Sequence, residues 1–229
     1  MALLYAMVGH GGASAYLALM ALFSFSPEVM KPTALLLNLF VAGISFIQFG
    51  RKGFFNLKLF LVFALSSIPF SYLGGLQDID EHLYKQILGA LLLFAVARIL
   101  GIFGKNNRKN EVNWPVGLLV GAVVGYFSGL IGIGGGIILS PIILLLGWGN
   151  VKQTAAVSAL FIWVNSLAGM LGQITKGIQL VDNVWLYVLL AVTGGVLGGY
   201  IGSQKINFKQ LNIALAIVLL TASIKLIFF

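Results

Sequence analysis

Apolar runs long enough to cross a bilayer recur from one end of this chain to the other, and they constrain the fold more than any other feature. A helix needs about 20 such residues, with a range of roughly 17 to 25, to span the hydrocarbon core. Of the 229 residues, 59% are hydrophobic and 9% are charged, whereas about a quarter are charged in soluble domains. The sequence therefore predicts an all-α integral membrane protein built as a polytopic helix bundle.

The apolar runs define nine candidate segments. They are Ala2–Phe23, Thr33–Phe49, Leu57–Leu76, Leu83–Phe103, Pro115–Ile131, Gly134–Trp148, Thr154–Ile174, Val184–Ile201 and Leu211–Phe228. Gly134–Trp148 is short for a full crossing, so it is either a tilted crossing or the returning arm of a re-entrant hairpin. No stretch between the segments is polar enough for a separate soluble domain, and we predict one membrane domain over residues 1–229.

Composition removes several classes of function. The chain has no cysteine, which excludes disulfides and thiolate metal sites. Its formal net charge of +8 is typical of basic cytoplasmic loops in a membrane protein, so we do not expect nucleic acid as a partner. No ATPase motif is present, and no bound cofactor is expected.

The two halves of the chain look duplicated. Lys31-Pro32-Thr33-Ala34 aligns with Lys152-Gln153-Thr154-Ala155, and Tyr84-Lys85-Gln86-Ile87 aligns with Phe208-Lys209-Gln210-Leu211. Repeat one then covers residues 1–104, a loop covers 104–113, and repeat two covers 114–229. Lys31 and Lys152 occupy matched positions at the mouths of their helices, where they serve either to draw anions in or to orient the chain.

Loop charges predict opposite orientations for the two repeats. The basic loops near residues 51–58, 105–109 and 205–209 belong in the cytoplasm of a cell-membrane protein, which leaves the acidic loop with Asp78, Asp80 and Glu81 outside. Corresponding segments of the two halves then cross the membrane in opposite directions. Inverted repeats of this kind are the architecture of many secondary carriers.

Dense glycine interrupts the apolar pattern at one place in each half. Gly132-Ile133-Gly134-Gly135-Gly136 lies within the run that begins near Trp114, and Gly9-His10-Gly11-Gly12-Ala13 lies near the start of the chain. Glycine weakens helices, and backbone groups freed in a bilayer need partners inside the protein. Two broken segments at corresponding places predict a transporter site near the membrane midplane.

The second break is similar to a known family motif. The run Gly129-Leu130-Ile131-Gly132-Ile133-Gly134-Gly135-Gly136-Ile137-Ile138-Leu139-Ser140-Pro141 resembles the TauE/SafE family of membrane transporters, also called the sulfite exporter family. The tails of the repeats, Ser71–Gly75 and Gly198–Ser203, also look similar. The first break departs from the motif, because His10 and Ala13 replace an apolar residue and a glycine. The resemblance implies transport, generally export, of sulfite, sulfonates or related sulfur-containing or organic anions.

The candidate substrate site combines both breaks. A helix that starts at Gly134, Gly135 and Gly136 presents unpaired amides and the positive end of its dipole to an anion, and Ser140 lies one turn further. Gly11, Gly12 and Ser14 would face them, and His10 would bind the anion, relay a proton or stay neutral near the interface. Asn38 and Asn165 follow the breaks and either contact the ligand or join helices. The alternative for the glycines is close packing or a kink.

Other residues have structural interpretations. Gly117, Gly121, Gly125 and Gly129 recur every fourth residue, as do Gly194, Gly198 and Gly202, which predicts close helix packing. Arg98 and Lys225 lie near helix ends, from which their charges reach the membrane surface.

These features predict a secondary transporter that exports a small anion by alternating access. Its expected partners are the anionic substrate and the lipid bilayer, and coupling to an ion or proton stays open, as does the oligomeric state. One alternative is a passive anion channel. The other is an intramembrane hydrolase with Ser14 or Ser128 as nucleophile and His10 as base, which lacks a convincing elbow motif.

Overall fold

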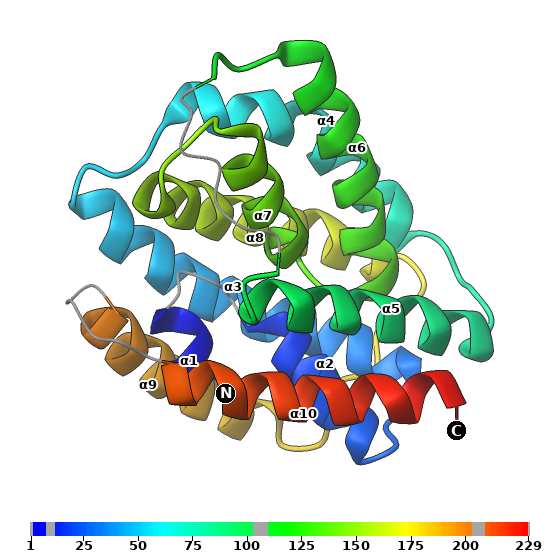
Figure 1. Cartoon of the computed structure of the whole chain (residues 1–229). Helices are drawn as coiled ribbons and strands as arrows, with labels where there is room; N and C mark the ends of the chain where they lie inside the picture. Colours follow the sequence, from blue (N-terminus) through cyan, green and yellow to red (C-terminus); the bar gives the residue numbers. More distant parts are fainter. Residues whose placement is uncertain (1, 8–11, 103–109, 203–208, 229) are drawn as a thin grey trace.

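The computed structural model describes residues 2–7, 12–102, 110–202 and 209–228, and every regular element among them is a helix. Figure 1 labels ten: α1 (Ala2–Met7), α2 (Ala13–Leu22), α3 (Pro27–Arg51), α4 (Leu57–Gly75), α5 (Glu81–Ile99), α6 (Trp114–Ile131), α7 (Gly136–Leu146), α8 (Val151–Ile174), α9 (Val184–Gly202) and α10 (Lys209–Phe228). The prediction of an all-helical membrane protein is confirmed.

Local chemistry explains where several helices begin. The side chains of Asn56, Asp80, Asn113 and Asn150 accept hydrogen bonds from amides of the first turns of α4, α5, α6 and α8. These amides have no partner within their own helices, so each cap satisfies groups that a bilayer cannot. α3 begins earlier than the apolar pattern predicts because Pro27 opens it, and proline is favoured at the first helical position.

The second glycine break separates α6 from α7. α6 ends at Ile131 and α7 begins at Gly136, while Gly132, Gly134 and Gly135 have φ angles of +85°, +76° and +75°. Residues with a Cβ atom avoid this left-handed region, so glycine is what permits the reversal of the backbone. In the first half, α1 and α2 are likewise separate helices, and Gly12 precedes α2 with a φ of +93°.

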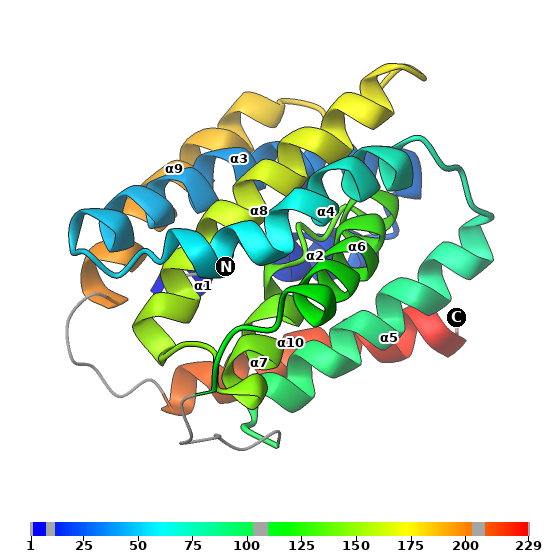
Figure 2. The same ribbon diagram turned by 90° about the horizontal axis from the view of Figure 1, so that it is seen from above.

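Five described helices are long and apolar enough to cross a membrane: α3, α4, α5, α6 and α8. α2 and α7 are shorter apolar helices, as are the segments Val184–Gly198 of α9 and Leu215–Phe228 of α10. Figures 1 and 2 show α3, α8 and α4 packed beside one another, with α6 against α4. α9 packs on α3, and α10 packs on α5.

The helix contacts are nearly unchanged when the two halves are exchanged. α4 packs on α6 and α8, and α9 packs on α1 and α3. α2 contacts α3 and α10, whereas α7 contacts α8 and α5. In this exchange α1–α5 correspond, in order, to α6–α10. α3 also packs on its own counterpart α8, and α5 packs on its counterpart α10.

The glycine stripes pack as predicted at the positions whose contacts are described, which do not include Gly202. A Cβ at Gly117, Gly121, Gly125 or Gly129 of α6 would collide with α4, and the nearest atoms are mainly main-chain atoms from Val62 to Gly75. Gly194 and Gly198 of α9 meet the backbone of α1 at Ala2 and Leu3 in the same way. Contact between main chains is what small residues permit in lipid, where van der Waals packing replaces the hydrophobic driving force.

Candidate functional site

The second glycine break is buried where α3, α6 and α8 meet. Every residue from Ile131 to Ile137 is buried. A Cβ at Gly134 would lie 2.6 Å from Nδ2 of Asn38 on α3, and one at Gly135 would lie 2.9 Å from side-chain atoms of Val124 on α6 and Phe161 on α8. The absence of side chains at the break therefore lets three helices close around it.

Polar groups of three helices lie beside this break. Nδ2 of Asn38 donates a 3.2 Å hydrogen bond to Oγ of Ser166 on α8. Ser128, on α6, is fully buried next to Gly135, and its hydroxyl has no hydrogen-bond partner. Oδ1 of Asn38 also lacks a partner. An unpaired buried polar group costs about 1–3 kcal/mol, and two of the seven such atoms among the described residues lie at this break.

The start of α7 adds backbone donors to the same place. Gly135 precedes α7, and no side chain caps the helix there. Amides in the first turn of a helix lack intrahelical acceptors and lie at the positive end of its dipole. The geometry therefore puts anion-favouring backbone groups within reach of the Ser128 hydroxyl.

Two predicted site residues, Ser140 and Asn165, make hydrogen bonds to neighbouring helices. Oγ of Ser140 donates to the carbonyl oxygen of Gly136 at 2.7 Å and lies 2.9 Å from Oγ of Ser158. Nδ2 of Asn165 donates to Oγ of Ser67 on α4 and to the carbonyl oxygen of Phe161. Both residues join α8 to its neighbours.

The first break is described only in part. His10 and Gly11 lie outside the described residues. A Cβ at Gly12 would meet the ring of Tyr16, and Oγ of Ser14 donates to the hydroxyl of Tyr5 at 2.8 Å. The described contacts of Gly12 and Ser14 thus lie within the first half of the chain, and none of them brings these two residues to Gly134–Gly136.

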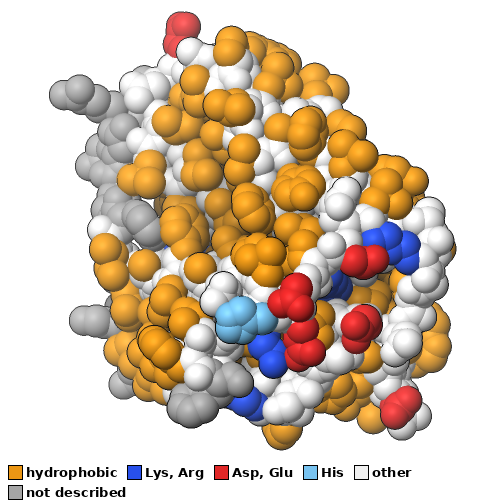
Figure 3. Space-filling view, turned by 90° about the vertical axis from the view of Figure 1, so that its right-hand side faces the viewer, with side chains coloured by type: hydrophobic (Ala, Val, Ile, Leu, Met, Phe, Trp, Pro, Cys, Tyr) orange, Lys and Arg blue, Asp and Glu red, His pale blue; other side chains and the backbone are white. Residues whose placement is uncertain are grey.

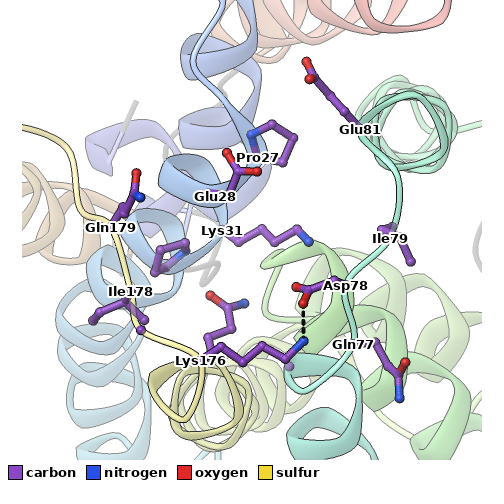
Figure 4. Close-up of a pocket in the computed structure, with 14 residues that line it drawn as sticks. Pro27, Glu28, Lys31, Gln77, Asp78, Ile79, Glu81, Lys176, Ile178 and Gln179 are labelled. Atoms are coloured by element: carbon purple, nitrogen blue, oxygen red, sulfur yellow. Dashed lines mark hydrogen bonds and ion pairs between the residues drawn. The ribbon is translucent and has the colours of Figure 1, made fainter.

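A cavity of about 370 Å³ opens beside the second break. Three segments line it: the start of α3, the loop between α4 and α5, and the loop between α8 and α9. In Figure 4, Nζ of Lys176 and Oδ2 of Asp78 join the two loops by an ion pair of 2.6 Å, and Lys31 extends into the cavity from α3. Figure 3 shows acidic and basic side chains gathered on one part of an otherwise largely hydrophobic face.

Residues of the cavity contact the last turn of α6. The backbone of Lys31 lies against Gly132, where a Cβ would be 2.9 Å from the Cα and carbonyl oxygen of the lysine. Nε2 of Gln173 donates to the carbonyl oxygen of Gly129 at 3.3 Å. Behind Lys31, the hydroxyl of Tyr84 donates to the carbonyl oxygen of Ile131 at 3.1 Å. The cavity floor is thus continuous with the glycine break.

Lys31 and Lys152, which the repeat alignment makes equivalent, have different surroundings. Lys31 is 9% exposed, and its ammonium lies 4.9 Å from the centre of the Tyr84 ring. Lys152 is exposed and lies over Phe54. The sequence suggests Lys31 only as one of two equivalent lysines at helix mouths, and Ser128 only as a nucleophile in the hydrolase alternative. The position of Lys31 next to the glycine motif is visible only in three dimensions.

The described residues include no group of three or more His, Asp or Glu side chains arranged to hold a metal ion. The side chains at the break are hydroxyls and amides, which suit hydrogen bonding to a ligand and not tight coordination of a transition metal.

Comparison with known proteins gives one consistent result. A family model described as "Sulfite exporter TauE/SafE" matches residues 1–226. "Probable membrane transporter protein y4hK" of Sinorhizobium fredii is 35% identical, with 99% of this chain and 94% of the relative covered. "Probable membrane transporter protein YunE" of Bacillus subtilis is 26% identical, with 89% and 82% covered. No solved structure matches the chain.

Proposed function

Because the chain belongs to the sulfite exporter TauE/SafE family and is a membrane transporter, we propose that it is a secondary carrier for a small sulfur-containing or organic anion. Sulfite and sulfonates are the leading substrates. Transport runs by alternating access, with export as the direction and the cell membrane as the location. The basic loops near residues 51–58, 105–109 and 205–209 face the cytoplasm.

The exchange of helix contacts between the halves supports an inverted repeat. When α1–α5 is substituted for α6–α10, the principal packing pairs map onto one another. Together with the opposite loop charges, this relation favours two repeats of about 1–104 and 114–229 that cross the membrane in opposite directions. Such repeats rock against one another about a central site, which is the basis of alternating access.

The observation that carries the proposal is the buried, unpaired hydroxyl of Ser128 next to Gly135 and the uncapped start of α7. A hydroxyl and free amides in one buried place are donors for an oxyanion. We assign substrate contact to Gly134, Gly135, Gly136 and Asn38, with Ser128 and Ser166 added. Ser140 and Asn165 position the helices around them, and His10, Gly11, Gly12 and Ser14 remain candidates for the opposite half of the pathway.

The test is saturable flux of sulfite and ethanesulfonate in proteoliposomes that contain the purified protein. Ser128→Ala removes an unpaired group, so its melting temperature stays at or above that of the wild type. Loss of a hydrogen bond to a charged ligand costs about 1.5–3 kcal/mol, so flux at low substrate concentration falls about tenfold or more. Ser223→Ala is the matched control, because its hydroxyl is also buried but donates to Gly89 between α5 and α10.

Counterflow separates a carrier from a passive channel. A carrier loaded with unlabelled substrate accumulates labelled substrate transiently against its gradient, whereas a channel does not. Absence of saturable flux for sulfite, sulfonates and small carboxylates, or equal flux in Ser128→Ala and the wild type, would overturn the assignment.

A further inference from the structure

Lys31 is a buried cation with no counter-ion among the described residues. The residue is 9% exposed, no described carboxylate lies within ion-pair distance of it, and its ammonium makes no described hydrogen bond. The face of Tyr84 is its described contact. A buried charge without a partner costs several kcal/mol, so the ammonium is expected to have a ligand in the working protein.

The neighbouring charges do not fulfil that role. The other charged side chains that line the cavity are Glu28, Asp78, Glu81 and Lys176. Asp78 is paired with Lys176 and is 84% exposed as a side chain. Glu81 is paired with Lys85 and is 60% exposed as a side chain, and Glu28 is exposed at the rim. The carboxylates therefore lie toward water, and the charge deep in the cavity is the positive charge of Lys31.

The end of α6 does not need Lys31 as a cap either. The negative end of a helix dipole attracts cations, and the C-terminus of α6 lies next to this lysine. Two carbonyl oxygens of that last turn, of Gly129 and Ile131, already accept hydrogen bonds from Gln173 and Tyr84. The ammonium is thus free to face the cavity.

We propose that Lys31 forms an outer binding site for the transported anion, a small monovalent oxyanion such as a sulfonate, one step from the glycine break. The inference rests on the proposed function and adds a residue that recognises charge. Lys31 supplies the charge, and Gln173, which also lines the cavity, supplies the amide N–H that is not bonded to Gly129. Because the backbone of Lys31 lies against Gly132, an anion bound here is next to the segment that leads to Gly134–Gly136.

Binding of ethanesulfonate to purified protein tests the inference, measured by calorimetry in phosphatidylcholine nanodiscs that hold no anionic lipid. Lys31→Met weakens binding at least tenfold, and Lys31→Arg, which keeps the charge, stays within about threefold of the wild type. Lys58→Met is the matched control. Lys58 is an exposed lysine in the first turn of α4 that does not line the cavity, and its loss leaves binding unchanged.

Each other outcome overturns the inference. Wild-type affinity in Lys31→Met would show that the lysine does not contact the anion. A melting temperature of the ligand-free variant lower by more than about 5 °C would show that Lys31 is structural, because loss of an unpaired buried charge should not destabilise the fold. Competition by added phosphatidylglycerol would assign the ammonium to lipid headgroups.

The failure of this inference is distinguishable from failure of the proposed function. If the wild type transports ethanesulfonate and Ser128→Ala is impaired while Lys31→Met binds normally, only the outer site is wrong. If the wild type neither binds nor transports any anion tested, both fail.

Discussion

Asn38 on α3 donates a 3.2 Å hydrogen bond to Ser166 on α8, directly beside the backbone of Gly134. The oxygen of the same amide has no partner. Asn165, on α8, uses its Nδ2 group for two hydrogen bonds, to Ser67 and to the carbonyl oxygen of Phe161. Oδ1 of Asn165 also has no partner, so the two amides differ in their donor groups. Nδ2 of Asn38 joins α3 to α8 beside the break, whereas Nδ2 of Asn165 ties α8 to α4.

This difference predicts opposite effects for two alanine substitutions. Asn165→Ala lowers the free energy of unfolding by about 1–3 kcal/mol because Ser67 and Phe161 lose their donor, and flux per folded molecule is kept. Asn38→Ala removes one interhelical hydrogen bond, worth about 0.6–2 kcal/mol in a membrane, and lowers flux at least tenfold. Thermal denaturation and proteoliposome flux measure the two quantities, and an equal loss of flux in both variants would contradict the distinction.

Gly134→Ala tests the steric constraint at the break. A Cβ there would lie 2.6 Å from Nδ2 of Asn38 and 2.9 Å from Ile162, at a φ of +76°. Left-handed strain costs about 1–2 kcal/mol and overpacking adds about 1–3 kcal/mol, so unfolding free energy falls by at least about 2 kcal/mol. Gly53→Ala is the control, because its φ is +72° but nothing lies within 4 Å. Equal melting temperatures for the two variants would mean that the break is not tightly enclosed.

Local features of this fold were predictable from the sequence. The helix break at Gly132–Gly136 and the packing stripe from Gly117 to Gly129 follow from the chemistry of glycine alone. The bounds of α6, Trp114–Ile131, differ by one residue from the predicted Pro115–Ile131 because Asn113 caps the helix. These features depend on neighbours within a few residues.

Contacts between distant segments were not predictable in the same way. The alignment of repeats treated Lys31 and Lys152 as equals, but Lys31 lies in a cavity against Gly132 and Lys152 is exposed. Ser140 lies one turn after the glycine break, where a residue could contact a ligand. Its hydroxyl bonds to the carbonyl oxygen of Gly136 and to Oγ of Ser158. Which partner satisfies a buried polar group is decided by the neighbouring helix, and a single sequence does not specify that helix.

The interface of α4 and α6 predicts a strong effect of a single methyl group. A Cβ at Gly129 would collide with the carbonyl oxygen of Ser71 and the amide of Gly75, which are backbone atoms that cannot move aside. Gly129→Ala separates the two helices and lowers unfolding free energy by about 1–3 kcal/mol or more. Leu119→Ala on the outer face of α6, where the side chain is 68% exposed, changes it little because lipid is as apolar as leucine. Detergent-based melting curves compare the two, and similar losses would argue against close contact.

Lys225 has a role beyond the predicted reach to the membrane surface. Its ammonium donates to the carbonyl oxygen of Leu22, the last residue of α2, at 2.7 Å, and to Oγ of Ser24 at 2.8 Å. Ser24 has a φ of +59°, so α10 holds a strained turn that leads into α3.

Lys225→Met is therefore expected to lower unfolding free energy by about 1–3 kcal/mol. Lys85→Met breaks a surface pair with Glu81 that is worth at most about 1 kcal/mol. Melting temperatures of both variants in the same detergent check the order. If the melting temperature of Lys225→Met equals that of the wild type, the ammonium of Lys225 faces water or headgroups and does not cap α2. If it melts lower and flux falls only in proportion to the folded fraction, the turn before α3 is a point of stability and not part of the transport pathway.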